Sequence, residues 1–363
     1  MAGLKIDLEG EWASMAKTME TEQEALLGKD NVVGIGLGPK LKDEKETGDN
    51  CISVMVSHKL DPSMVKSDDM IPPTLGKFKT DVIETGEIFA GALSTADTAK
   101  VEQLVKDLMG NQDLATREAP ATPYMLDQAE EMMEEELRIE TLRNRVRPAQ
   151  GGFSVGHFRV TAGTIATAVI DRAAYPGMPR RYYILSNNHV LANSNNARVG
   201  DPIVQPGTID GGRLPRDIIG RLSRWVNIRF RSGSSAPRNY VDAAIAEVQF
   251  HDIGRDVYWI GYADGLATVR PGDIVQKTGR TTNYTTGRVR LINATVNVNY
   301  GGGRSARFVR QIITTRMSSG GDSGSLLFNM SRKAVGLLFA GSSSITVFND
   351  IRYVRSLLGI HIA

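Results

Sequence analysis

The chain of 363 residues contains a single cysteine, Cys51, so no disulfide can form within it. Its first residues mix Lys5, Asp7 and Glu9 with apolar positions and lack the basic segment and apolar run of a signal peptide. No stretch reaches the ~20 apolar residues that span a bilayer. These absences predict a cytoplasmic protein with no membrane span, in which Cys51 is a buried structural thiol.

The chain also lacks an overall excess of charge, because its formal net charge is only +2. Residues 1–140 nevertheless hold 14 Lys/Arg and 29 Asp/Glu, which gives a net charge of −15. The remaining residues hold 29 Lys/Arg and 12 Asp/Glu, which gives a net charge of +17. A basic half can indicate nucleic-acid binding. Here the basic residues are scattered and form no block interleaved with aromatic residues, so we expect no nucleic-acid partner. The opposite charges predict instead that the two halves attract each other.

Residues 1–90 are expected to form a small α+β domain. Apolar positions at near-helical spacing predict a helix over 11–28, and strands are expected at 31–39, 51–59 and 79–88. The glycines at 34, 36 and 38 do not have the spacing of a dinucleotide-binding loop. We predict no cofactor and no metal site, and we interpret His58 as structural or solvated.

Residues 91–149 are expected to form an acidic, helical connector. Helices are predicted at 96–108 and at 124–146, the second with an apolar stripe and a run of three glutamates. Such a connector can also lie on a neighbouring domain and regulate it.

Short apolar runs separated by turn residues begin at Gly151 and are typical of an all-β sandwich or barrel. The main strands are expected at 160–170, 181–186, 218–222, 226–230, 239–248, 273–277, 288–292, 308–315 and 334–339. A last helix is expected after residues 349–350, whose side chains can cap it.

A possible catalytic constellation lies within this β-rich part. Ser323 stands in a glycine-rich loop, His189 follows a predicted strand, and Asp242 opens an apolar run. A serine nucleophile needs a base and a group that orients the base, and the order His, Asp, Ser occurs among the known triads. The acid is open to alternatives that also lie between the histidine and the serine, namely Asp201, Asp210 and Asp217. We interpret His157 and His251, two other histidines of this part, as structural.

The motifs LSNNHVLA at 185–192, DAAI at 242–245 and GDSGS at 321–325 resemble those of the trypsin/chymotrypsin-like serine peptidases. They are most similar to an intracellular, disulfide-free microbial branch, and GRTT at 279–282 resembles the hairpin that opens the second barrel. The resemblance covers about residues 150–363. It implies two six-stranded β-barrels with the active site between them, and it places the backbone N–H groups of Gly321 and Ser323 in an oxyanion hole.

The same resemblance implies the substrate-binding positions. Met317 would lie near the base of the primary specificity pocket, which favours a neutral residue before the scissile bond. The segment from Phe339 to Gly341 would pair with the substrate as an added strand. The family also implies that Asp322 needs a cationic partner, either a new N-terminus or an arginine. A chain without this partner would be a latent enzyme.

The expected architecture is therefore mixed: a C-terminal all-β chymotrypsin-like double β-barrel at 150–363, preceded by the small α+β domain and the helical connector. The expected function is that of a cytoplasmic serine endopeptidase acting on protein or peptide substrates. Its acidic N-terminal region would restrain it, as in a zymogen, or would target it. The alternative is an inactive scaffold that binds peptides through a protease fold.

Overall fold

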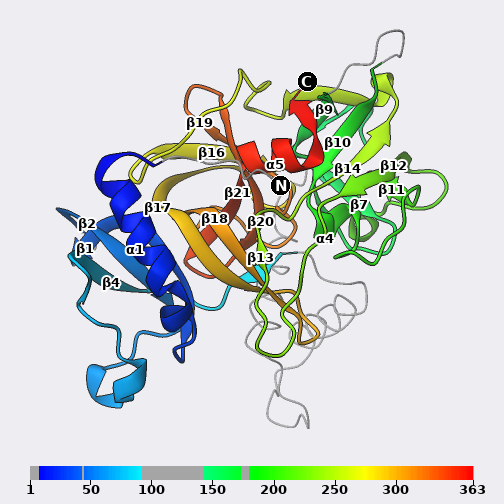
Figure 1. Ribbon diagram of the computed structural model, residues 1–363. Coiled ribbons are helices and arrows are strands. Elements are labelled where there is room, and N and C mark those ends of the chain that lie inside the picture. Colours follow the sequence, from blue (N-terminus) through cyan, green and yellow to red (C-terminus); the bar gives the residue numbers. More distant parts are fainter. Residues whose placement is uncertain (1–7, 43–44, 92–141, 173–179, 363) are drawn as a thin grey trace, which may run out of the picture.

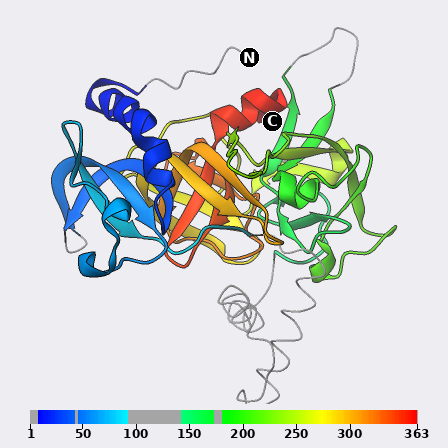
Figure 2. The same ribbon diagram turned by 60° about the horizontal axis from the view of Figure 1, so that its bottom comes forward.

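The computed structural model describes residues 8–42, 45–91, 142–172 and 180–362 (Figure 1). Three bodies stand in a row in Figure 2: the blue N-terminal elements, a barrel of yellow to red strands, and a barrel of green strands. We call the first body, residues 10–84, the N-terminal unit. The predicted mixed fold is confirmed, with β-structure dominating the part from residue 149 onward.

The N-terminal unit contains the predicted helix and strands. The helix α1 (Gly10–Leu27) buries Met15, Met19 and Leu26 against the sheet. That sheet is formed by β1 (Val32–Lys42), β2 (Lys45–Val56), β4 (Phe78–Glu84) and β3 (Thr74–Leu75), in this order. Cys51 is fully buried in β2, as predicted.

The strand predicted at 79–88 ends earlier than expected. After β4 the chain leaves the sheet, and Gly86 adopts a φ of +72°, a left-handed conformation that suits glycine and interrupts a strand. A separate short strand, β5 (Phe89–Ala90), then pairs with β17 (Asn283–Asn299) and β20 (Ala334–Gly341) in the next body.

The sheet of the N-terminal unit continues into that next body, because β1 pairs antiparallel with β17. The glycines of β1 permit this close pairing. A Cβ atom on Gly34 would lie 2.8 Å from the Thr295 carbonyl oxygen, and one on Gly38 would lie 2.6 Å from Leu291 Cδ2. The alternating glycines are therefore explained by strand packing. The domain boundary near residue 90 stays a prediction.

The middle body is a closed barrel of six strands. In order around the barrel they are β16 (Ile274–Gly279), β17, β18 (Ser305–Thr315), β21 (Ile345–Asp350), β20 and β19 (Leu326–Asn329), and β19 pairs again with β16. The short strand β13 (Arg238–Asn239) pairs parallel with β18.

The other barrel is built around an eight-stranded sheet, whereas six strands were expected. Its order is β22 (Ile360–Ile362), β9 (Thr167–Asp171), β10 (Tyr182–Ser186), β14 (Ala244–Val248), β12 (Ile218–Trp225), β11 (Pro202–Val204), β7 (Ser154–His157) and β8 (Gly163–Thr164). A parallel pair, β15 (Ile253–Val257) with β6 (Ala149–Gly151), adds to it. The helix α5 (Ile351–Leu358), capped by Asp350 as expected, leads from the middle barrel back to β22.

Most of the predicted connector lies outside the described residues, including the helix at 96–108. For the helix predicted at 124–146, only residues 142–146 are described, and these form a turn, a bend and irregular chain, so that part of the prediction is wrong. The cause is tertiary packing: Leu142 is fully buried in the core of the green barrel, and its carbonyl accepts a hydrogen bond from Ser154 N. No helix within the described ranges is long and apolar enough to cross a membrane.

Candidate active site

The loop that carries Ser323 lies between β18 and β19 and depends on glycine at two positions. Gly321 and Gly324 have φ values of +93° and +101°. A Cβ atom on Gly324 would overlap the Thr164 carbonyl group of the green barrel. The Thr164 N–H donates to the Ser323 carbonyl at 2.7 Å, and its hydroxyl donates to the Gly321 carbonyl at 2.9 Å. The serine loop of one barrel is thus fixed on the other.

His189 and Asp242 are brought together by the pairing of β10 with β14. His189 lies in the short helix α4 (Asn188–Leu191) that follows β10, and Asp242 lies two residues before β14. The His189 Nδ1 atom is 2.6 Å from the Asp242 Oδ2 atom, and the His189 backbone N–H donates to Oδ1 at 3.1 Å. Both side chains are buried. The carboxylate therefore fixes the imidazole ring through Nδ1 and makes no contact with its Nε2 atom.

The two groups on which a proton transfer would depend have no hydrogen-bond partner among the described residues. His189 Nε2 and Ser323 Oγ are both buried and unpaired. Buried polar atoms are normally satisfied, and exceptions are frequent at catalytic groups. A Cβ atom on Gly163 would lie 2.7 Å from Val190 Cγ1 and 2.9 Å from the Ser323 carbonyl oxygen, so the chain next to His189 and the serine loop meet at one point.

Tyr300 completes the surroundings of Asp242 and was not predicted. Its hydroxyl donates to Asp242 Oδ2 at 2.7 Å, at the end of the long strand β17. Burial, followed by the negative charge of Asp242, raises the pKa of Tyr300 well above its usual value, so this hydroxyl keeps its proton as a donor. No motif marks this tyrosine in the sequence.

Asp322 has a cationic partner within the chain. Lys277 Nζ lies 2.9 Å from Asp322 Oδ2, and both side chains are fully buried. The Thr281 N–H and the Thr282 hydroxyl donate to the same carboxylate at 2.9 Å and 2.6 Å. Burial alone would raise the pKa of Asp322, but Lys277 and Thr282 lower it below its usual range. The partner is a lysine, where an arginine or a new N-terminus was expected, so an unpaired Asp322 gives no route to a latent enzyme here.

The GRTT motif at 279–282 lies in the hairpin that supports the serine loop. A Cβ atom on Gly279 would lie 2.7 Å from Asp322 Cγ, so only glycine lets the carboxylate approach. Burial lowers the pKa of Lys277, because it penalises the ammonium, whereas the nearby carboxylate acts in the opposite direction. Residues 277–282 thus form the buried support of the serine loop.

The other acidic candidates are engaged elsewhere. Asp201 Oδ2 lies 3.1 Å from His157 Nε2, and Asp210 accepts from Arg280 Nε at 2.9 Å. Asp217 pairs with Arg216 at 2.9 Å. Two further histidines, His58 and His251, are exposed. Asp242 is the one of the four acidic residues that contacts His189.

The predicted oxyanion donor and substrate strand are both in contact with residues 88–91 of the same chain. The Gly321 N–H donates to the Gly91 carbonyl at 3.2 Å. The strand β20, which includes Phe339 and Gly341, pairs antiparallel with β5. Met317 is 4% exposed and packs in the hydrophobic core next to Gly287, and its place in the specificity pocket stays a prediction.

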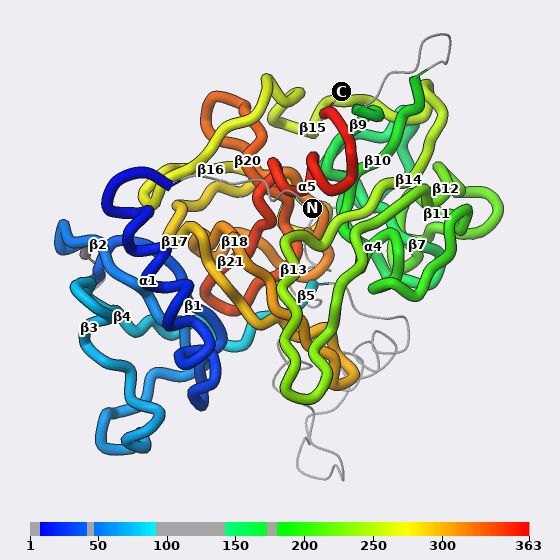
Figure 3. The backbone as a smooth tube through the Cα atoms, in the orientation of Figure 1, coloured from blue at the N-terminus to red at the C-terminus, as the bar shows by residue number. Residues whose placement is uncertain are grey.

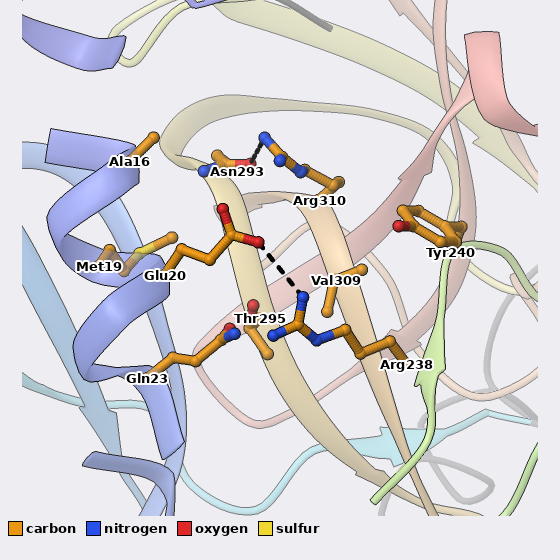
Figure 4. Close-up of a pocket in the computed structure, with 10 residues that line it drawn as sticks. All are labelled: Ala16, Met19, Glu20, Gln23, Arg238, Tyr240, Asn293, Thr295, Val309 and Arg310. Atoms are coloured by element: carbon orange, nitrogen blue, oxygen red, sulfur yellow. Dashed lines mark hydrogen bonds and ion pairs between the residues drawn. The ribbon is translucent and has the colours of Figure 1, made fainter. Parts of the chain in front are cut away.

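A cavity of about 40 Å³ lies away from these residues, between α1 and the strands β17 and β18 (Figure 4). Glu20 of α1 reaches across it to Arg238 at 3.3 Å. The cavity contains none of the site residues described above. It is a polar gap in the contact between the N-terminal unit and the middle barrel.

Residues 166–337 match the family model of the trypsin-like peptidase domain. This part of the chain carries a trypsin-like peptidase domain, which is the domain of a serine endopeptidase. The matched range contains the histidine, the aspartate and the serine described above. No curated protein sequence matches the chain.

Similar solved structures include bacterial proteases. Thermobifida fusca protease A is 18% identical, with 59% of this chain and 97% of that chain covered and a TM-score of 0.41. The Cellulomonas bogoriensis chymotrypsin is also 18% identical, with the same coverage and a TM-score of 0.38. A Nocardiopsis protease is 17% identical, again with 59% and 97% covered, at 0.39.

Proposed function

We propose that the chain hydrolyses peptide bonds in proteins or peptides through the triad His189, Asp242 and Ser323. The observation that carries this proposal is the pairing of His189 Nδ1 with Asp242 at 2.6 Å while Nε2 and the Ser323 hydroxyl are buried and unpaired. A base that is oriented on one side and free on the other is what a serine nucleophile needs. The family match supports the same reaction class.

In the proposed mechanism Ser323 Oγ attacks the carbonyl carbon of the scissile bond while its proton passes to His189 Nε2. The carbonyl oxygen becomes an oxyanion that accepts hydrogen bonds from the Gly321 and Ser323 N–H groups. The bond to nitrogen then breaks, and the leaving amine takes the proton from His189. Water attacks the resulting ester, again with His189 as the base, and restores the serine hydroxyl. Asp242 stays ionised and stabilises the imidazolium.

The oxyanion donors and the hydrogen bond from Tyr300 to Asp242 would both contribute to the rate enhancement. Loss of a single oxyanion donor in such a site typically costs about 2.7–4 kcal/mol, so the positions of Gly321 and Ser323 matter greatly. The Lys277–Asp322 pair and the Thr164 contacts hold those two residues. Tyr300 acts as a positioning residue, because its hydroxyl contacts Asp242 and not the substrate.

We further propose that the N-terminal region restrains the enzyme and that the enzyme works in the cytoplasm. The contact of residues 88–91 with the oxyanion donor and with β20 supports restraint. The single, buried cysteine suits a reducing compartment. Deleting the N-terminal region is a poor test of restraint, because β1 pairs with β17 and both share one hydrophobic core.

A point substitution tests restraint in the full chain. Ile88 is 1% exposed in the core of the middle barrel, so Ile88→Ala weakens the docking of residues 88–91. We expect about tenfold faster hydrolysis of a small peptide, since a contact of ~1.4 kcal/mol corresponds to that factor. Leu60→Ala, at a side chain that is 46% exposed, is the control. Unchanged hydrolysis by a folded Ile88→Ala chain would contradict restraint.

Hydrolysis of a defined peptide pool, followed by mass spectrometry, tests the activity itself. We expect fragments from the wild-type and Ile88→Ala chains and none from Ser323→Ala. Ser331→Ala, at an exposed serine of the same barrel, should behave as wild type. If neither the wild-type nor the Ile88→Ala chain cuts any peptide, the enzyme proposal fails and an inactive peptide-binding scaffold replaces it.

A further inference from the structure

Residues 85–91 leave the N-terminal unit and lie in the middle of the molecule, where Figure 3 labels β5. The segment is fixed at its start, because the hydroxyl groups of Ser342 and Ser344 both donate to the Thr85 carbonyl, the second at 3.1 Å. Its course therefore follows the edge of β20 up to the serine loop.

Residues 88–90 pair through their backbone with a neighbouring chain segment on each side, as a strand does. On one side Phe89 pairs with Gly341 and Ala90 with Ala340, in the antiparallel direction. On the other side the Asn299 N–H donates to the Ile88 carbonyl at 2.8 Å. An extended peptide that adds a strand to an exposed edge is a recurring way of binding peptides, with the backbone supplying affinity and alternate side chains supplying specificity.

The register of this strand places one particular carbonyl group at the catalytic centre. The Gly91 carbonyl accepts the Gly321 N–H, the donor assigned to the oxyanion. A Cβ atom on Gly91 would lie 2.9 Å from Ser323 Oγ and 3.8 Å from Gly320 Cα, so the Gly91 backbone is next to the nucleophile. A strand with a purely structural role would not need to end with its carbonyl on that donor.

We propose that residues 88–91 are the enzyme's own first substrate and that Ser323 cleaves the peptide bond between Gly91 and Ala92. This inference rests on the proposed endopeptidase function. Ser323 Oγ forms a bond to the Gly91 carbonyl carbon, and the bond to the Ala92 nitrogen breaks. The Ala92 amine takes the proton that His189 received from the serine. Water then releases Gly91 as a carboxylate, and the chain becomes two fragments, 1–91 and 92–363.

The contacts also define the substrate class. Ile88 and Ala90 are buried, at 1% and 6% exposure, whereas the last residue before the cut has no side chain. The site is thus suited to peptides with an aliphatic residue four positions before the cut, a small residue two positions before it, and glycine at the cut. After cleavage the pairing of β1 with β17 keeps the fragment 1–91 bound, with its new carboxylate in the site as a product inhibitor.

Intact-protein mass spectrometry on the purified full chain tests the proposal. We expect the wild-type chain to yield fragments that end at Gly91 and begin at Ala92, and the Ser323→Ala chain to stay whole. Gly91→Val places a branched side chain against Ser323 Oγ, so the cut fraction should fall about tenfold or more. Gly254→Val is the matched control, because the nearest atom to its Cβ position is 3.5 Å away.

A peptide with the sequence of residues 88–93, Ile-Phe-Ala-Gly-Ala-Leu, gives a second measurement on the Gly91→Val chain. Cleavage between Gly and Ala supports the proposal even if the variant docks its own segment poorly. A wild-type chain that hydrolyses other peptides but stays whole, or that is cut elsewhere while residues 88–92 remain joined, overturns this inference and leaves the endopeptidase intact. A chain that hydrolyses nothing overturns both.

Discussion

The buried pair of Lys277 and Asp322 gives the most quantitative prediction. Lys277→Met keeps the volume of the side chain roughly constant and removes its charge. Removing one partner of a buried ion pair costs about 3–5 kcal/mol, because the other charge is left without compensation. Asp322 keeps the hydrogen bonds from Thr281 and Thr282, so we expect a loss near the lower end, about 3 kcal/mol of unfolding free energy at pH 8.

The effect should depend on pH in a defined direction. In the wild-type chain the pKa of Asp322 is lowered, so its contribution to stability is complete above the unfolded value of about 3.9 and is lost as the pH falls below it. Without Lys277, burial raises the pKa of this carboxyl group, and protonation relieves the unpaired charge. The difference between variant and wild type should therefore shrink as the pH is lowered from 8 towards 4.

Urea unfolding followed by circular dichroism, in a Ser323→Ala background that prevents self-cleavage, measures this difference. The double variant Lys277→Met/Asp322→Asn should recover part of the loss, because no unpaired charge then remains. A loss below about 1 kcal/mol at pH 8, which is the range of exposed ion pairs, would refute the reasoning. So would a loss of equal size at pH 8 and pH 4.

Three other predictions each depend on the surroundings of one residue. Tyr300→Phe removes a hydrogen bond to the Asp242 carboxylate, worth about 1.5–3 kcal/mol, so kcat/KM should fall about 10- to 100-fold with the fold unchanged. The ascending limb of its pH dependence should also move to higher pH, whereas a merely structural role would leave that limb in place. Gly279→Ala forces a Cβ atom against a buried carboxylate and should cost about 1–3 kcal/mol, and Gly254→Ala should cost much less; equal losses in urea unfolding would argue against the close approach. Burial raises the pKa of Cys51 to about 11, so iodoacetamide at pH 8 should alkylate it only after unfolding, and rapid reaction of the native chain would contradict its burial.

The sequence was most informative where the chemistry requires particular residues in a local motif. Ser323 and its glycines are adjacent in the chain, and His189 and Asp242 each mark the boundary of an apolar strand. The structure places the last two in contact through the pairing of β10 with β14. The six-stranded barrel was expected from the family resemblance alone. Strand pairing over long sequence distances leaves little local pattern in the sequence.

The contacts that could not be predicted are those between residues far apart in the chain. Tyr300 meets Asp242 across 58 positions, and Lys277 meets Asp322 across 45. Neither lysine nor tyrosine stands in a motif, so only the barrel geometry reveals their partners. The same holds for residues 88–91, because the sequence predicts only a strand over 79–88 that belongs to the N-terminal domain. Tertiary pairing with β20 assigns these residues to the active site instead.

The glycines of β1 show how a sequence pattern can stay unexplained until its packing is known. Their spacing excluded a nucleotide loop, and the sequence offered no other role. Each glycine instead removes a side chain that would collide with β17 or β2, so the pattern reflects the joining of two sheets.

A covalent probe tests whether Ser323 is the nucleophile of a serine endopeptidase. The wild-type and Ile88→Ala chains are treated with a fluorophosphonate, digested and mapped by mass spectrometry. We expect a single adduct on Ser323, formed faster in Ile88→Ala and absent in Ser323→Ala. No adduct in either folded chain, or an adduct that persists in Ser323→Ala, would contradict this role of Ser323.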